Sequence, residues 1–80
     1  MNKTRRYPEL NYLKGKIREC NSSYRELAKV IGISPTTLND KINGYSVFDT
    51  EEVNKIVKEL NIEPNEVVRI FFSTYVSFRN

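Results

Sequence analysis

Basic side chains are concentrated in the first half of the chain. Residues 1–45 contain nine Lys or Arg and four Asp or Glu, a balance of +5, whereas residues 46–80 contain four and six, a balance of −2. This asymmetry is typical of a domain that offers one face to phosphate groups and uses its other half for a different purpose. A mixed, solvated surface is the alternative interpretation.

Side chains for acid–base catalysis or metal binding are scarce. The sequence has no histidine, so the commonest general base and the commonest metal ligand are both absent. Capping and helix-dipole effects explain the carboxylates at predicted helix starts, which are half of the ten: Asp49, Glu51, Glu52, Glu63 and Glu66. The single Cys20 continues a helical apolar pattern, so we expect it to fill a gap in the core. We therefore expect no enzyme, no cofactor and no metal site.

Length and composition predict one compact domain in a cytoplasmic protein. The 80 residues are 39% hydrophobic and 29% charged, and no apolar run approaches the ~20 residues that cross a bilayer. The first ten residues lack the apolar run of a secretory signal. A domain of this size buries a limited fraction of its surface, so a dimer partner would add useful burial.

The residue pattern from 23 to 31 predicts a short helix. Ser23 is a suitable N-cap, and Glu26 is placed to complete a capping box by reaching back to the Ser23 amide. Gly32 ends the helix because glycine adopts the left-handed conformation at almost no cost. The residues expected to face inward are Leu27, Ala28 and Ile31, with Ile33 filling the corner of the turn.

A second short helix is predicted directly after this turn. Ser34 caps it and Pro35 suits its first position, so it runs over residues 35–43 and Gly44 closes it. Leu38 and Ile42, four residues apart, form its buried stripe. The remaining positions present polar side chains on the outer faces: Thr36, Thr37, Asn39, Asp40, Lys41 and Asn43.

Three further helices are predicted around this pair. The first starts near Pro8 or Glu9, reaches Asn21, and has an apolar stripe of Leu10, Leu13, Ile17 and Cys20. The fourth begins after Asp49 with a capping box to Glu52, and its apolar stripe is Val53, Ile56, Val57 and Leu60. Phe48 is expected to pack onto Val53, and Asn61 to be a left-handed stop. The fifth helix starts at Pro64 and carries Val67, Val68, Ile70 and Phe71.

The two ends of the chain fall outside these helices. Residues 1–8 form a basic arm with Lys3, Arg5 and Arg6, which either follows DNA or is a disordered tail. Residues 72–80 fit either a strand or a continued helix, and we favour a strand because aromatic and β-branched residues dominate. So much apolar surface predicts a self-pairing segment that makes a dimer.

The pattern of residues 23–44 resembles the helix-turn-helix of the phage repressor and Cro family, also called XRE-type regulators. The resemblance rests on residues at the family's spacing: Leu27, Ala28, Gly32, Ile33, Leu38, Ile42, Asn43 and Gly44. It extends over roughly residues 10–70. It implies an all-α, five-helix DNA-binding domain over residues 9–71, with the arm and the aromatic tail as additions.

The resemblance also implies where DNA would lie. The helix over residues 35–43 would enter the major groove, and the helix that starts at Tyr24 would cross the backbone. The implied base-facing residues are Pro35, Thr36, Asp40 and Ser46, and we add Thr37 and Asn39. The implied phosphate contacts are Ser23, Tyr24, Ser34 and Asn43, and we add the basic residues Arg5, Arg6, Lys16 and Lys41.

Two of the implied base-facing residues differ from the long amides usual there. Pro35 offers only apolar contact, and Asp40 would accept from a cytosine amino group while repelling phosphates. We therefore expect specificity to depend on DNA shape and on Thr36, Thr37, Asn39 and Lys41.

Two functions remain open on this evidence. The first is a sequence-specific transcription regulator, Cro-like or a small repressor, that binds a pseudo-palindromic operator as a homodimer. Its predicted dimer residues are Phe71, Phe72, Tyr75, Val76 and Phe78. The second is an anti-repressor or modulator that binds another regulator, which Pro35 and Asp40 favour. For both we expect a bacterial or phage-encoded, nucleoid-associated protein with no membrane partner.

Overall fold

The computed structural model describes residues 4–72, which fold into five helices without a strand in that range. They are α1 (Asn11–Glu19), α2 (Tyr24–Ile31), α3 (Pro35–Ile42), α4 (Thr50–Glu59) and α5 (Pro64–Phe71). The predicted all-α, five-helix class is confirmed. The prediction of a strand after the fifth helix falls on residues 73–80, which lie outside the described range.

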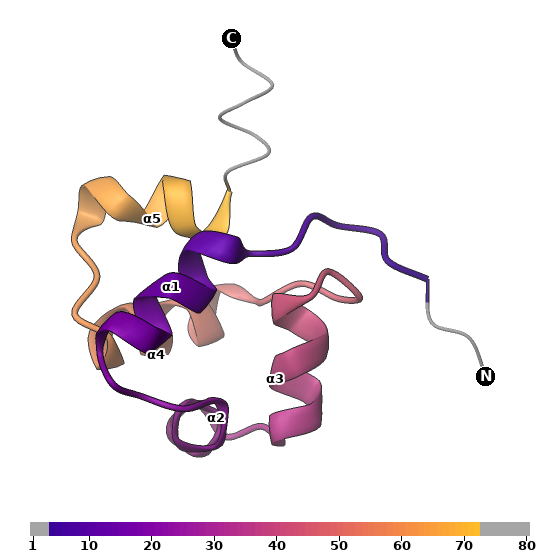
Figure 1. The fold of residues 1–80 in the computed structure, drawn as a ribbon, viewed down its shortest axis with the longest axis horizontal. Coiled ribbons are helices and arrows are strands. Elements are labelled where there is room, and N and C mark those ends of the chain that lie inside the picture. Colours follow the sequence, from indigo (N-terminus) through magenta and orange to yellow (C-terminus); the bar gives the residue numbers. More distant parts are fainter. Residues whose placement is uncertain (1–3, 73–80) are drawn as a thin grey trace, which may run out of the picture.

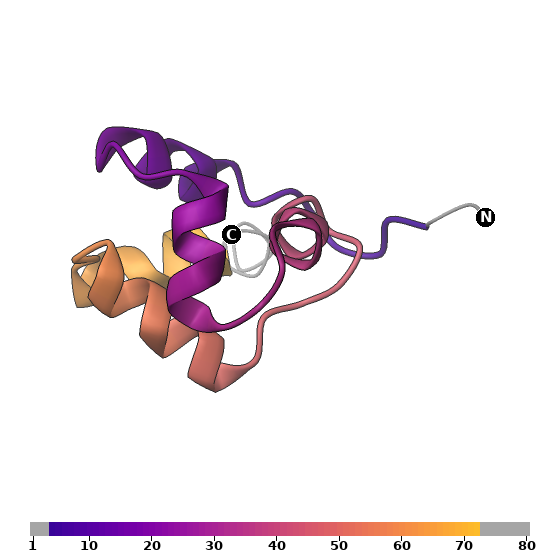
Figure 2. The same ribbon diagram turned by 90° about the horizontal axis from the view of Figure 1, so that it is seen from below.

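The helices pack around α2. This helix contacts both α3 and α4, while α1 contacts α5 and α3. Figures 1 and 2 show α2 and α3 crossing steeply, since each helix is seen end-on in the view where the other is seen along its length. Four helices contribute the largest fully buried side chains, which are Leu13, Leu27, Leu38, Ile42 and Ile56, all predicted from helical periodicity.

Capping side chains fix the starts of the central helices. Ser23 Oγ accepts from the Glu26 amide at 3.1 Å, and Ser34 Oγ accepts from the Thr37 amide at 3.0 Å. The predicted capping box at Asp49 is present in both directions. At α2 the predicted box differs, because the Glu26 carboxylate accepts from the Ser23 hydroxyl at 3.4 Å rather than from the Ser23 amide.

Left-handed residues end the helices as expected. Gly32 has φ +83° after α2, and Asn61 has φ +53° between α4 and α5. Gly44 has φ +93° and is buried beneath the N-terminal arm. A Cβ on residue 44 would collide with the backbone carbonyl of Tyr7, so two independent constraints require glycine there.

The N-terminal arm lies across the end of α3, contrary to the alternative of a disordered tail for its described part (Figure 1). The amides of Arg6 and Tyr7 both donate to the Gly44 carbonyl at 3.0 Å, and the Leu10 amide donates to the Ile42 carbonyl at 2.9 Å. Because Leu10 is held by α3, α1 begins at Asn11, and its predicted start near Pro8 or Glu9 was wrong.

Cys20 was wrongly predicted to be a core residue. It is the exposed C-cap residue of α1, where the helical period ends, and its Sγ donates to the Leu60 carbonyl at 3.5 Å. Phe71 was predicted both on the apolar stripe of the fifth helix and at the dimer contact. It is 9% exposed and packs edge-to-face on Phe48 with ring centroids 6.0 Å apart, so it belongs to the core.

Candidate nucleic-acid interface

The outer face of α3 carries the predicted base-facing residues. Pro35, Thr36, Thr37 and Asn39 are exposed, and Asp40 is half-buried. On the opposite face Leu38 and Ile42 are fully buried, so the helix cannot rotate without breaking the core. The helix therefore presents a fixed row of small polar side chains to solvent.

Two hydrogen bonds order this row of side chains. Ser34 Oγ donates to Thr37 Oγ1 at 2.9 Å, which ties Thr37 to the cap of its own helix. Asn43 Nδ2 donates to Asn39 Oδ1 at 3.1 Å, which leaves the Asn39 amino group to act as a donor. Bidentate reading of adenine would use the Asn39 amino group as donor and the second lone pair of Oδ1 as acceptor, since the first accepts from Asn43.

Asp40 and Ser46 lie at the C-terminal end of α3, beside the turn into the next loop. The Asp40 carbonyl accepts from the Tyr45 amide at 2.9 Å, and both Asp40 and Ser46 are half-buried. Ser46 lines an apolar groove together with Val47 and Phe48. These two predicted base-facing residues are therefore less accessible than Thr36 or Asn39.

Two lysines predicted as phosphate contacts point into the protein instead. Lys41 Nζ lies 2.6 Å from Glu52 Oε1, and its side chain is 15% exposed. Lys16 Nζ lies 3.5 Å from Glu66 Oε1, and its side chain is also 15% exposed. Each lysine joins two helices, so in this structure neither is placed to meet a phosphate.

A hollow of about 230 Å³ lies at the start of α2, where phosphate contacts were predicted. Ser23 and Tyr24 line it, as do Lys14 and Arg18 from α1, whose role sequence reasoning missed. The signal that could have found them is their spacing of four residues on the polar side of α1. They bring basic side chains to the border of a helix N-terminus, which favours anions, while the Lys14 ammonium lies 3.8 Å from Glu9 Oε1.

Tyr24 completes the hollow as a hydrogen-bond donor. Burial raises the pKa of its hydroxyl above the ordinary value of 10.0, and the nearby positive charge of Arg18 only partly opposes this. The hydroxyl therefore keeps its proton at neutral pH and can donate to an acceptor such as a phosphate oxygen.

The arm places two arginines near the C-terminal end of α3. The Arg5 guanidinium pairs with Glu9 at 3.0 Å and lies 5.5 Å from the centre of the Tyr45 ring. Arg6 is exposed, while its backbone amide is bound to Gly44. The structure thus brings the predicted arm and α3 together through the Gly44 turn.

No helix within residues 4–72 is long and apolar enough to cross a bilayer.

Comparison with known proteins agrees with this geometry. No curated protein matches the chain significantly. A family model described as Helix-turn-helix (HTH_3) matches residues 13–67, which span α1 to the first turn of α5. The chain therefore belongs to the XRE-type helix-turn-helix family of DNA-binding transcription regulators, a regulatory rather than an enzymatic family.

Proposed function

We propose that the protein binds a specific operator as a homodimer and reads the major groove with α3. The observation that carries this proposal is the two-sided character of α3. Leu38 and Ile42 hold it in the core, while Thr36 and Asn39 remain exposed. Two such helices in a symmetric dimer would meet half-sites about 34 Å apart on a pseudo-palindrome.

The base-facing and phosphate-facing roles divide between different elements. Thr36 meets a base edge or a thymine methyl group, and Asn39 donates to a base acceptor. The surface formed by Thr36 and Asn39 is bordered by Pro35, Thr37, Asp40 and Ser46. The hollow at the start of α2 takes one phosphate through Arg18 and the Tyr24 hydroxyl, and the Arg6 side chain takes another.

In this proposal the protein is a Cro-like or small repressor that acts by excluding polymerase from a promoter. Its expected setting is the cytoplasm of a bacterium, encoded by the host or by a phage. Thr36 and Asn39 are short side chains, so much of the specificity comes from DNA shape at bases the protein does not touch.

Selection of binding sites from random DNA tests the proposal, followed by fluorescence anisotropy over a salt series. We expect one enriched pseudo-palindrome and an affinity that falls steeply with salt. Asn39→Ala should reduce discrimination against mismatched sites by about tenfold. Asn54→Ala, at an exposed position of α4, is the matched control and should change neither property. Absence of salt-dependent binding at micromolar protein would refute the proposal.

A second candidate is an interaction protein that binds another regulator. The observation that favours it is Lys41, the single basic residue of α3, which pairs with Glu52 and leaves the reading helix without an outward cation. Co-purification with another DNA-binding protein, combined with no shift of bare DNA, would support this candidate against the first.

A further inference from the structure

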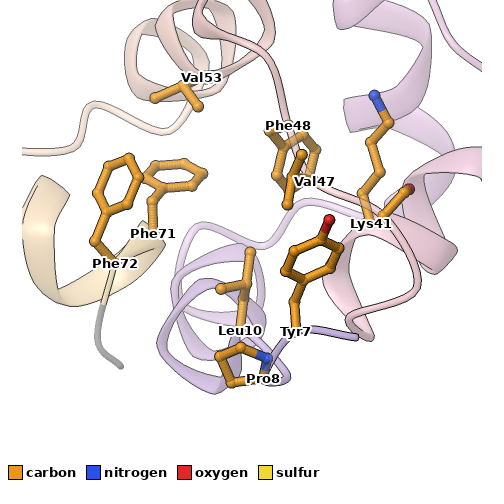
Figure 3. A pocket seen from close by; sticks show the side chains of 10 residues that line it. Tyr7, Pro8, Leu10, Lys41, Val47, Phe48, Val53, Phe71 and Phe72 are labelled. Carbon is orange, nitrogen blue, oxygen red and sulfur yellow. The ribbon is translucent and has the colours of Figure 1, made fainter. Parts of the chain in front are cut away.

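An apolar groove of about 360 Å³ lies between the N-terminal arm, the loop after α3, and α5 (Figure 3). Phe71 and Phe72 stand on one side of it, Tyr7 and Val47 stand on the other, and Leu10 lies between them. Three large side chains at its rim remain exposed: Tyr7 at 40%, Val47 at 54% and Phe72 at 51%. Such an apolar concentration on a small DNA-binding domain calls for an occupant.

The chain itself supplies a segment that fits. Phe72 lines the groove, and residues 73–80 (STYVSFRN) follow it directly. In an extended conformation Val76 and Phe78 would share one face and Tyr75 the other. Eight extended residues span about 26 Å, which is enough to cross a groove of this volume.

We propose that residues 73–80 of a second copy fill this groove, and that the exchange is reciprocal. Residues 73–79 contain no Gly, Pro, Asn or Asp, and Ser73 and Ser77 are their only residues of a type common in turns, so little in the segment directs a tight reversal onto the groove of the same chain. Each segment follows Phe72, which lies at the rim of its own groove. A two-fold axis beside Phe72 would therefore bring each segment close to the groove of the other copy. The contact is isologous and closes as a dimer.

This inference rests on the proposed homodimer and adds a consequence for DNA binding. Tyr7 lies in the arm, and Ser46 lies in the loop after α3, and both line the groove. A partner segment seated there holds both elements against the end of α3. Dimerisation and the placement of Arg6 would therefore be linked through the same groove.

Cross-linking between two single-cysteine chains tests the proposal, with Cys20→Ser in every chain. One chain carries Val47→Cys at the groove rim and the other carries Ser77→Cys in the segment. After mixing under mild oxidation, we expect the mixed disulfide to form more than tenfold faster than in a control pair, because docking raises the effective concentration toward ~mM. The control replaces Val47→Cys by Val30→Cys, a similarly exposed position on α2 away from the groove.

Equal rates in the two pairs would overturn the proposal. A single chain carrying both Val47→Cys and Ser77→Cys gives the second readout. An oxidised monomer would show that the segment fills its own groove, and an oxidised dimer supports exchange. The Cys20→Ser parent separates this idea from the proposed function. If the parent is dimeric and binds DNA but the Val47→Cys and Ser77→Cys pair shows no preferential cross-link, only the groove assignment is refuted, whereas a monomeric parent refutes the homodimer itself.

Discussion

Lys41 Nζ lies 2.6 Å from Glu52 Oε1, and this ion pair joins the last turn of α3 to the first turn of α4. The same oxygen accepts from the Asp49 amide at 3.0 Å, so one carboxylate both caps α4 and anchors α3. Lys41 Nζ also lies 5.8 Å from the centre of the Phe48 ring. The two side chains are only 15% and 12% exposed, so the pair is worth more than a fully solvated one.

A second lysine makes the same arrangement at α5. Lys16 Nζ lies 3.5 Å from Glu66 Oε1, and that oxygen accepts from the Glu63 amide at 3.2 Å. In both places a capping glutamate in the first turn of a helix receives a lysine from an earlier helix. Two of the protein's cations therefore join helices in this structure.

Replacing Lys41 should lower stability while leaving the salt dependence of DNA binding unchanged. Lys41→Met removes the partner of a poorly exposed carboxylate, and we expect a loss of about 1–2 kcal/mol in the free energy of unfolding. Urea denaturation measures this loss, and anisotropy over a salt series measures the slope of log K against log salt concentration. Lys55→Met, which breaks an exposed pair with Glu51, is the control and should change stability by less than about 0.5 kcal/mol. A slope that became shallower by about one unit would make Lys41 a phosphate contact after all.

The fate of Lys41 also shows where sequence reasoning stops. Caps such as Ser34 and buried pairs such as Leu38 and Ile42 depend on neighbours within a few residues, so spacing alone predicts them. The direction of Lys41 depends on Glu52, a residue of the next helix, and nothing local separates it from a solvated lysine. The carbonyl of Gly44 likewise binds the arm across nearly forty residues, which no periodicity reveals.

Gly44 should be the least replaceable glycine of the chain. Gly44→Ala meets both a left-handed φ of +93° and a collision with the Tyr7 carbonyl, so the arm must move away. Gly32→Ala is the matched control, because its φ of +83° is similar but no atom lies within 4 Å of the added Cβ. We expect Gly32→Ala to cost about 1–2 kcal/mol and Gly44→Ala to cost more, as measured by urea denaturation. Limited proteolysis should then cut the arm faster only in Gly44→Ala. Equal losses in the two variants would mean that the arm contributes nothing at Gly44.

Tyr24 should make stability depend on pH in the alkaline range. Its pKa is raised in the folded state by burial, so the unfolded chain loses this proton first. The stability that this difference in pKa contributes to the folded state is fully present below the ordinary value of 10.0 and is lost as pH rises through the folded pKa. Above that pH, the free energy of unfolding of the wild type should therefore fall relative to that of Tyr24→Phe. A difference that stayed constant across the titration would contradict the buried environment of Tyr24.

Lys14 and Arg18 should bind phosphate without reading sequence. They line the hollow with Ser23 and Tyr24, at a helix start that favours anions, and Lys14 is only loosely paired with Glu9 at 3.8 Å. Arg18→Ala should weaken binding to all sequences by a similar factor and make the salt slope shallower by about 0.9, because one fewer counterion is released. The double variant with Lys14→Ala should change the slope by about twice as much.

Anisotropy over a salt series, with operator and scrambled DNA, measures both the slope and the specificity ratio. Lys58→Ala, an exposed position in the last turn of α4, is the matched control and should leave both unchanged. If Lys14 and Arg18 meet the DNA backbone and no bases, as we propose, the ratio between operator and scrambled DNA should stay constant while the absolute affinities fall. A fall in the ratio would place Arg18 at a base edge. An unchanged slope together with an unchanged affinity would move the phosphate contacts away from this hollow altogether.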